Sequence, residues 1–290
     1  MSEQRRGPVV VGVDGSASAL DAVRWAAGEA AARRVGLRLV AVFTPLPRSP
    51  RHDLGLAARY REHAVEELRG QLTSAAGVVT AAAPEVTVET DLRTGYPAPV
   101  LVEESHGASL TVVGSRGLGG FSGLLVGSVA VAIAAHGGSP VLVVRGDRGP
   151  DAALPVVLGV DGSPAGESAV GIAFELAARR SVPLRAVHAW SDTAVGQDGA
   201  VLIDRQTLET EEREVLAERL AGWAQKFPDV DVQRVVVRDR PAHALVEEAA
   251  GAAVVVVGSR GRGGLTGLLL GSVGQALLHH ADSPVLIARP

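Results

Sequence analysis

The 290-residue chain contains no cysteine, which excludes disulfides, thiolate catalysis and cysteine-based metal sites. Lysine occurs once, at Lys226, far from any glycine-rich segment. Aromatic residues make up only 3%, so the cores must be built from Val, Leu, Ala and Ile. The net charge of −4 gives no general attraction to nucleic acid or to an anionic membrane. The first residues lead directly into an apolar strand without the hydrophobic stretch of a signal peptide.

A glycine motif occurs twice with the same spacing. Gly-Ser-Arg-Gly at 114–117 is followed after nine residues by Gly-Ser at 127–128, and the same pattern recurs at 258–261 and 271–272. Residues 113–145 and 257–289 are identical at 20 of 33 positions without a gap. A second repeated block, ending in Val-Asp-Gly-Ser, opens each half. A period of about 145 residues is the size of one compact domain. We therefore expect two domains, 1–148 and 153–290.

Valine-rich apolar runs predict five strands in each half, with helices between them. Ser16 and Ser163 are candidate caps of the first helix in their halves, and Pro164 suits a first helical position. Alternating strands and helices imply parallel pairing with right-handed crossovers, and hence an open doubly wound α/β sheet per half. The strands are expected at 8–13, 37–43, 86–92, 110–114 and 140–145, and at 155–160, 184–190, 231–238, 253–258 and 284–289.

The two repeated blocks are expected to meet in space. In a doubly wound sheet the ligand lies beyond the carboxyl ends of the strands, where the strand order reverses. With the order 3-2-1-4-5, Asp14 follows strand 1 and the glycine loop follows strand 4 of the first half; Asp161 corresponds in the second. A carboxylate can accept hydrogen bonds from ribose hydroxyls, while backbone N–H groups of the loop and of the next helix N-terminus face phosphates. This arrangement predicts a nucleotide site in each half.

Three other readings of the glycine segments are disfavoured. A P-loop needs a lysine directly after its last glycine, and none is there. A dinucleotide fingerprint should follow the first strand, whereas these glycines follow the fourth. The uncharged stretch 117–135 approaches the length of a membrane span, but five of its residues are glycine and two are serine. A loop followed by a buried helix explains it better.

These motifs resemble those of the universal stress protein family in its tandem, two-domain form, over nearly the entire chain. The resemblance implies two Rossmann-like (HUP-type) domains, each with a five-stranded parallel sheet of order 3-2-1-4-5. It also implies one ATP per domain and a cytoplasmic protein linked to stress, dormancy or growth arrest. The family further suggests a homodimer of tandem chains, with the terminal strands of the two halves associating within each chain.

The resemblance assigns ligand contacts residue by residue. Asp14 and Asp161 would contact the ribose or adenine region, and Val42 and Ala189 would offer backbone groups to the adenine edge. The remaining implied contacts belong to the first strands, glycine loops and following helix starts: Gly12, Gly114, Ser115, Arg116, Gly117, Leu118, Gly119, Gly120, Gly127, Ser128 and Val129 in the first half, and Gly159, Gly258, Ser259, Arg260, Gly261, Arg262, Gly263, Gly264, Gly271, Ser272 and Val273 in the second.

Glycine is expected at 117 and 261 because a Cβ would intrude where the backbone approaches a phosphate, and a positive φ there would also require it. The two loop arginines, Arg116 and Arg260, either contact phosphate or face solvent. Arg262 replaces Leu118 in the second half, where it either strengthens phosphate binding or points to solvent.

No catalytic constellation stands out. His136 and His280 occupy equivalent positions near a helix end, which favours a structural role. No compact His/Asp/Glu spacing predicts a protein metal site, so Mg²⁺ would be held mainly by the phosphates of ATP. Two functions remain open: a nucleotide-dependent regulator, and an enzyme with slow ATP hydrolysis or other ATP chemistry. A purely structural partner-binding module is a weaker third, because both glycine loops are intact.

Overall fold

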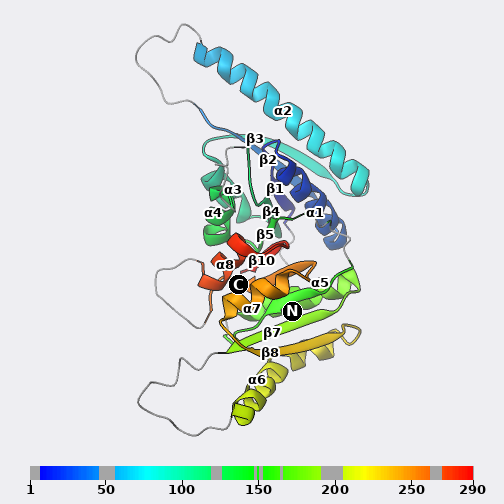
Figure 1. The fold of residues 1–290 in the computed structure, drawn as a ribbon. Coiled ribbons are helices and arrows are strands. Elements are labelled where there is room, and N and C mark those ends of the chain that lie inside the picture. Colours follow the sequence, from blue (N-terminus) through cyan, green and yellow to red (C-terminus); the bar gives the residue numbers. More distant parts are fainter. Residues whose placement is uncertain are drawn as a thin grey trace, which may run out of the picture. The chain divides into compact units, whose positions relative to one another are not determined.

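The computed structural model describes residues 7–45, 56–118, 126–146, 149, 153–163, 166–190, 205–261 and 270–289. The chain divides into two compact units, Met1–Pro150 and Asp151–Pro290. Each unit contains parallel strands alternating with helices (Figure 1). The α/β class predicted from the alternating pattern is therefore confirmed.

The first unit is a parallel sheet in the order β3-β2-β1-β4-β5, which is the predicted order. Helix α1 packs against α2, and α3 packs against α4, so that helices cover both faces of the sheet (Figure 1). The strands are β1 Val9–Gly12, β2 Leu37–Phe43, β3 Val88–Thr94, β4 Leu110–Gly114 and β5 Val141–Val144; the helices are α1 Ala17–Arg33, α2 Leu56–Ala82, α3 Pro97–Ser105 and α4 Ser128–His136.

The second unit repeats this plan in the order β8-β7-β6-β9-β10, which is again 3-2-1-4-5 within the unit. Helix α5 packs against α6, and α7 against α8. The strands are β6 Val156–Gly159, β7 Leu184–Trp190, β8 Val232–Arg238, β9 Val254–Gly258 and β10 Val285–Ala288; the helices are α5 Glu167–Arg180, α6 Arg205–Lys226, α7 Pro241–Ala249 and α8 Ser272–His280.

The helix that follows the first strand starts differently in the two units. Ser16 caps α1 as predicted, since its Oγ accepts the Ala19 N–H at 3.1 Å. Ser163 accepts the equivalent bond from the Gly166 N–H at 3.2 Å, but the α-helix starts only at Glu167. Ser163 is therefore not the N-cap of α5, and Pro164 lies outside the described residues.

The cores consist mainly of Val, Leu, Ala and Ile, with a few aromatic side chains. Trp25, Leu39 and Ile133 are among the fully buried side chains of the first unit, and Phe174 and Leu158 among those of the second. The central strands β4 and β9 are buried along almost their entire length, as expected for strands covered on both faces. Among the helices that the structure describes, none combines the length and the apolarity that crossing a bilayer requires.

Candidate functional site

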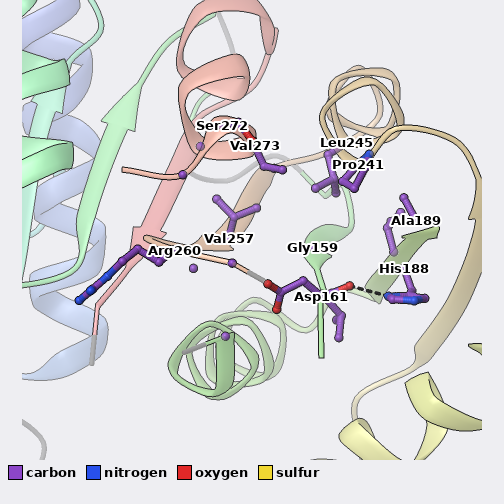
Figure 2. A pocket seen from close by; sticks show the side chains of 17 residues that line it. Gly159, Asp161, His188, Ala189, Pro241, Leu245, Val257, Arg260, Ser272 and Val273 are labelled. Carbon is purple, nitrogen blue, oxygen red and sulfur yellow. Dashed lines mark hydrogen bonds between the residues drawn. The ribbon is translucent and has the colours of Figure 1, made fainter. Parts of the chain in front are cut away.

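A cavity of about 380 Å³ opens at the carboxyl ends of the second unit's strands. Its wall combines the ends of β6, β7 and β9 with the N-terminal ends of α7 and α8 (Figure 2). Three groups of predicted site residues therefore come together: the first-strand end, the glycine loop and the start of the helix after the loop. The lining residues predicted from the sequence are Gly159, Asp161, Ala189, Gly258, Arg260, Gly261, Gly271, Ser272 and Val273.

Backbone hydrogen bonds fix the glycine loop at both of its ends. The Ser259 N–H donates to the Ala288 C=O of β10 at 3.0 Å, and the Gly271 N–H donates to the Ser259 C=O at 2.8 Å. Ser115 makes the same two contacts in the first unit, with Val144 at 2.8 Å and Gly127 at 2.7 Å. Both serines are only 6% exposed. The backbone groups of both serines thus anchor the loop, and the ligand contacts assigned to them stay a prediction.

The helix after each glycine loop starts without a side-chain cap. Gly127 and Gly271 are the N-caps of α4 and α8, and glycine has no side chain with which to satisfy the first N–H groups. In the second unit Ser272, Val273 and Gly274, the first three residues of α8, line the cavity. Open N–H groups and the positive end of the helix dipole make this end of the cavity suited to an anion.

An aspartate lies directly against each glycine loop. Asp14 accepts the Ser16 N–H through Oδ1 at 3.0 Å and the Leu118 N–H through Oδ2 at 3.1 Å. Asp161 accepts both the N–H and the hydroxyl of Ser163 through Oδ1, at 2.9 and 2.8 Å. These hydrogen bonds hold each carboxylate between the end of the first strand and the glycine loop of its unit.

The apposition of aspartate and loop explains the glycines in a way that the sequence did not reveal. A Cβ built on Gly117 would lie 2.3 Å from Asp14 Oδ2, and one on Gly261 would lie 2.7 Å from Asp161 Oδ2. The suggested positive φ is wrong, because neither glycine has its φ in the left-handed region. Glycine is needed for space beside a carboxylate, not for an unusual backbone angle.

The second strand of each unit supplies backbone groups on the opposite side of the crevice. The Val160 N–H donates to the Val187 C=O at 2.9 Å, so Val187 directs its backbone polar groups toward β6. Residues two apart in a strand direct these groups to the same side. Ala189 therefore presents an N–H and a C=O beyond the end of β6, where the cavity lies. Val40 accepts the equivalent bond at 2.8 Å, and Val42 has the corresponding position.

The arginine of the second loop does not reach over the cavity. Arg260 lines the mouth, but its side chain extends away from the space between Asp161 and Leu245 (Figure 2). Burial lowers the pKa of Arg289, and the nearby positive charge of Arg260 lowers it further. Arg260 thus lies near a second cation, Arg289, and its contact with phosphate stays a prediction.

Several predicted contacts cannot be placed. Gly119, Gly120, Arg262, Gly263 and Gly264 lie outside the described residues. No group of three or more His, Asp or Glu side chains in the described ranges could hold a metal ion. His136 ends α4 and bonds the Ala132 C=O at 3.0 Å through Nδ1, as expected for a structural residue.

The sequence reasoning missed part of the wall. Pro241 and Leu245 of α7 line the cavity, and the Pro-x3-Leu spacing shared with Pro97 and Leu101 is the signal that could have found them. His188 also lines the cavity, and it has no counterpart in the first half that would have drawn attention to it.

The comparisons with known proteins match this arrangement. A model of the Universal stress protein family matches residues 6–145 and again 154–289. The chain belongs to the universal stress protein family. It is a tandem member, as the repeat predicted.

Two of the similar proteins span nearly the entire length of this chain. The universal stress protein Rv2005c of Mycobacterium tuberculosis (strain H37Rv) is 42% identical over 97% of this chain and 96% of its own. The crystal structure of a universal stress protein from Archaeoglobus fulgidus DSM 4304 covers 99% of both chains with a TM-score of 0.72 at 18% identity, so this likeness concerns the fold. A universal stress protein solved in complex with cAMP matches 47% of this chain and 97% of its own, at 27% identity and a TM-score of 0.36.

Proposed function

We propose that each domain of this universal stress protein binds one molecule of ATP and that the protein acts as a nucleotide-dependent regulator in stress or growth arrest. The observation that carries the proposal is the pairing, across one 380 Å³ cavity, of Asp161 with the uncapped N-terminus of α8. The carboxylate can accept hydrogen bonds from the hydroxyls of a ribose. The N-terminus of the helix attracts anions and therefore suits the phosphates.

The remaining wall suits the base. Val257, Leu245 and Pro241 give the cavity an apolar side, and the backbone N–H and C=O of Ala189 lie beside it. An adenine ring has flat apolar faces and an edge that carries both donors and acceptors. A site with a few placed polar groups on a mostly apolar wall is typical for such a ligand.

The first domain has the same anchors: Asp14 beside Gly117, Ser115 tied to Gly127, and the backbone groups of Val42. We therefore propose two sites per chain. Mg²⁺ would enter with ATP and be held mainly by phosphate oxygens, since phosphates and water suit this ion.

We expect binding with negligible turnover. Phosphoryl transfer depends on positioning and on electrostatic stabilisation of the moving group. The single lysine of the chain, Lys226, lies in α6 and does not line the cavity. His188, which does line it, has both ring nitrogens engaged with other groups. Regulation through occupancy is thus favoured over hydrolysis. We also keep the homodimer of tandem chains as a proposal.

Mass spectrometry of the purified and then denatured protein tests the proposal. Co-purified ATP at up to two molecules per chain is the expected result. Co-purified ADP or AMP, together with phosphate release near the usual kinase range of about 1 s⁻¹ or above, would favour the enzyme instead. If no nucleotide co-purifies and none binds on titration with ATP and Mg²⁺, nucleotide binding is wrong for this chain.

A further inference from the structure

His188 is a buried histidine held between two hydrogen-bond partners at the edge of the cavity in the second domain. It is 3% exposed and is the fifth residue of β7. Its Nδ1 lies 2.7 Å from the Val160 C=O and its Nε2 lies 2.8 Å from Glu212 Oε2 on α6. The first of these bonds is drawn in Figure 2. One ring thus links β6, β7 and α6 at the cavity wall.

The two partners of the ring determine where protons must be. A backbone carbonyl can only accept, so Nδ1 carries a hydrogen and donates it to Val160. The bond between Nε2 and the Glu212 carboxyl then requires one more proton, either on the ring or on the carboxyl group. The His188–Glu212 pair therefore holds one shared proton. Without it, a nitrogen lone pair and a carboxylate would face each other at 2.8 Å.

The first domain is built without this pair. Ala41 is the fifth residue of β2 and pairs with Leu92 of β3, as His188 pairs with Val236 of β8. Leu68 and Glu212 each lie 14 residues before the last residue of α2 and α6, respectively. An alanine has no donor for the carbonyl of the first strand, and a leucine cannot hold a proton. The polar pair is thus a property of the second site alone.

We propose that His188 is a positioning residue for the nucleotide site of the second domain. It acts through its hydrogen bond to the Val160 carbonyl and through its bond to Glu212, which connects α6 to β7. Val160 immediately precedes Asp161, and both line the cavity with His188. Fixing the Val160 carbonyl fixes the backbone that aims the Asp161 carboxylate. This inference rests on the proposed nucleotide function and makes the two sites unequal.

Titration calorimetry with ATP and Mg²⁺ can measure each site separately. Gly117→Glu leaves the second site to be measured, and Gly261→Glu leaves the first. In the first of these backgrounds, His188→Ala should weaken binding about tenfold, the effect of losing one hydrogen bond that positions a buried group. His188→Asn should stay within about threefold of the parent, because its side-chain N–H can donate to the same carbonyl.

A double variant separates positioning from stability. His188→Ala with Glu212→Leu recreates the pair of the first domain and removes the unpaired carboxylate that could unfold the single variant. Its second site should stay about as weak as that of His188→Ala, although thermal unfolding shows a stable fold. Restored affinity in this variant would mean that His188 acts only on stability, and would overturn the proposal.

The conservative variant supplies the remaining arm. His188→Asn as weak as His188→Ala contradicts the inference. A parent that binds two ATP while His188→Ala binds equally well overturns the inference alone; a parent that binds no nucleotide overturns the proposed function with it.

Discussion

A single methyl group on either loop glycine should weaken the nucleotide site of that domain. The Cβ of Gly117→Ala would lie 2.3 Å from Asp14 Oδ2, and that of Gly261→Ala 2.7 Å from Asp161 Oδ2. Real Cβ contacts essentially never fall below 3.0 Å. The Asp14 carboxylate must therefore move at least 0.7 Å away from the added Cβ, and the Asp161 carboxylate at least 0.3 Å. These values are the differences between the distances above and 3.0 Å.

In the first domain, this movement of the Asp14 carboxylate affects its hydrogen bond with the Leu118 N–H. The Leu118 N–H reaches Asp14 Oδ2 at 3.1 Å, already near the long end for an N–H···O bond. A further 0.7 Å would break it and would move the carboxylate from the place proposed for its contact with a ribose. A hydrogen bond to a charged group is worth about 1.5–3 kcal/mol, so Gly117→Ala should weaken ATP at the first site about ten- to a hundredfold. Gly261→Ala, with the smaller overlap, should have the smaller effect.

Replacement by glutamate adds bulk and a negative charge beside both the aspartate and the proposed position of the phosphates. Calorimetry on nucleotide-stripped protein should give a stoichiometry near two for the parent, near one for Gly117→Glu or Gly261→Glu and near zero for the double variant. Gly107→Ala and Gly251→Ala are matched controls, because a Cβ there meets nothing within 4 Å. Unchanged affinity in Gly117→Ala, or equal losses in the two controls, would refute the steric argument.

Three further predictions concern stability. Ser16→Ala removes the cap of α1 and should lower the unfolding free energy of the first domain by about 1 kcal/mol in urea titrations; an unchanged midpoint would contradict this. Phe174→Ala empties a fully buried position and should cost the second domain about 3–5 kcal/mol, whereas Tyr96→Ala, 69% exposed, should stay within about 0.5 kcal/mol. The hydrogen bond from His243 lowers the pKa of Asp239. The stabilising effect of this bond should be present at neutral pH and should disappear as pH falls through the lowered pKa of Asp239. An ordinary Asp239 pKa in an NMR titration would rule out this prediction.

The repeated pattern determined most of the fold. The sequence predicted all ten strands to within two residues at either end. The inner strands are continuously apolar because both of their faces are buried, whereas β3 and β8 carry polar residues and are partly exposed. The 20 identities between 113–145 and 257–289 determined the tandem plan. Ser16 and Ser163 show the limit of such patterns. The same Asp-Gly-Ser block starts α1 directly, but in the second unit α5 begins only at Glu167.

The sequence also determined which residue types gather in the crevice, since parallel strands all end at the same edge of a sheet. It did not determine what each residue does there. Ser115 and Ser259 are predicted as ligand contacts, and the structure adds that they are buried residues whose backbone groups anchor their loops. Gly117 and Gly261 read as phosphate contacts too, and the structure shows that each makes room for an aspartate about 100 residues away in the chain.

Only the tertiary structure found His188 and Glu212. They lie 24 residues apart on a strand and a helix, and no periodicity links them. Periodic patterns report the local geometry of one element, so they predict which elements form and in which order they pair. Contacts between side chains of different elements depend on how those elements pack. For that reason the sequence could define a repeated site, while the packing of α6 on β7 made the second copy of that site different from the first.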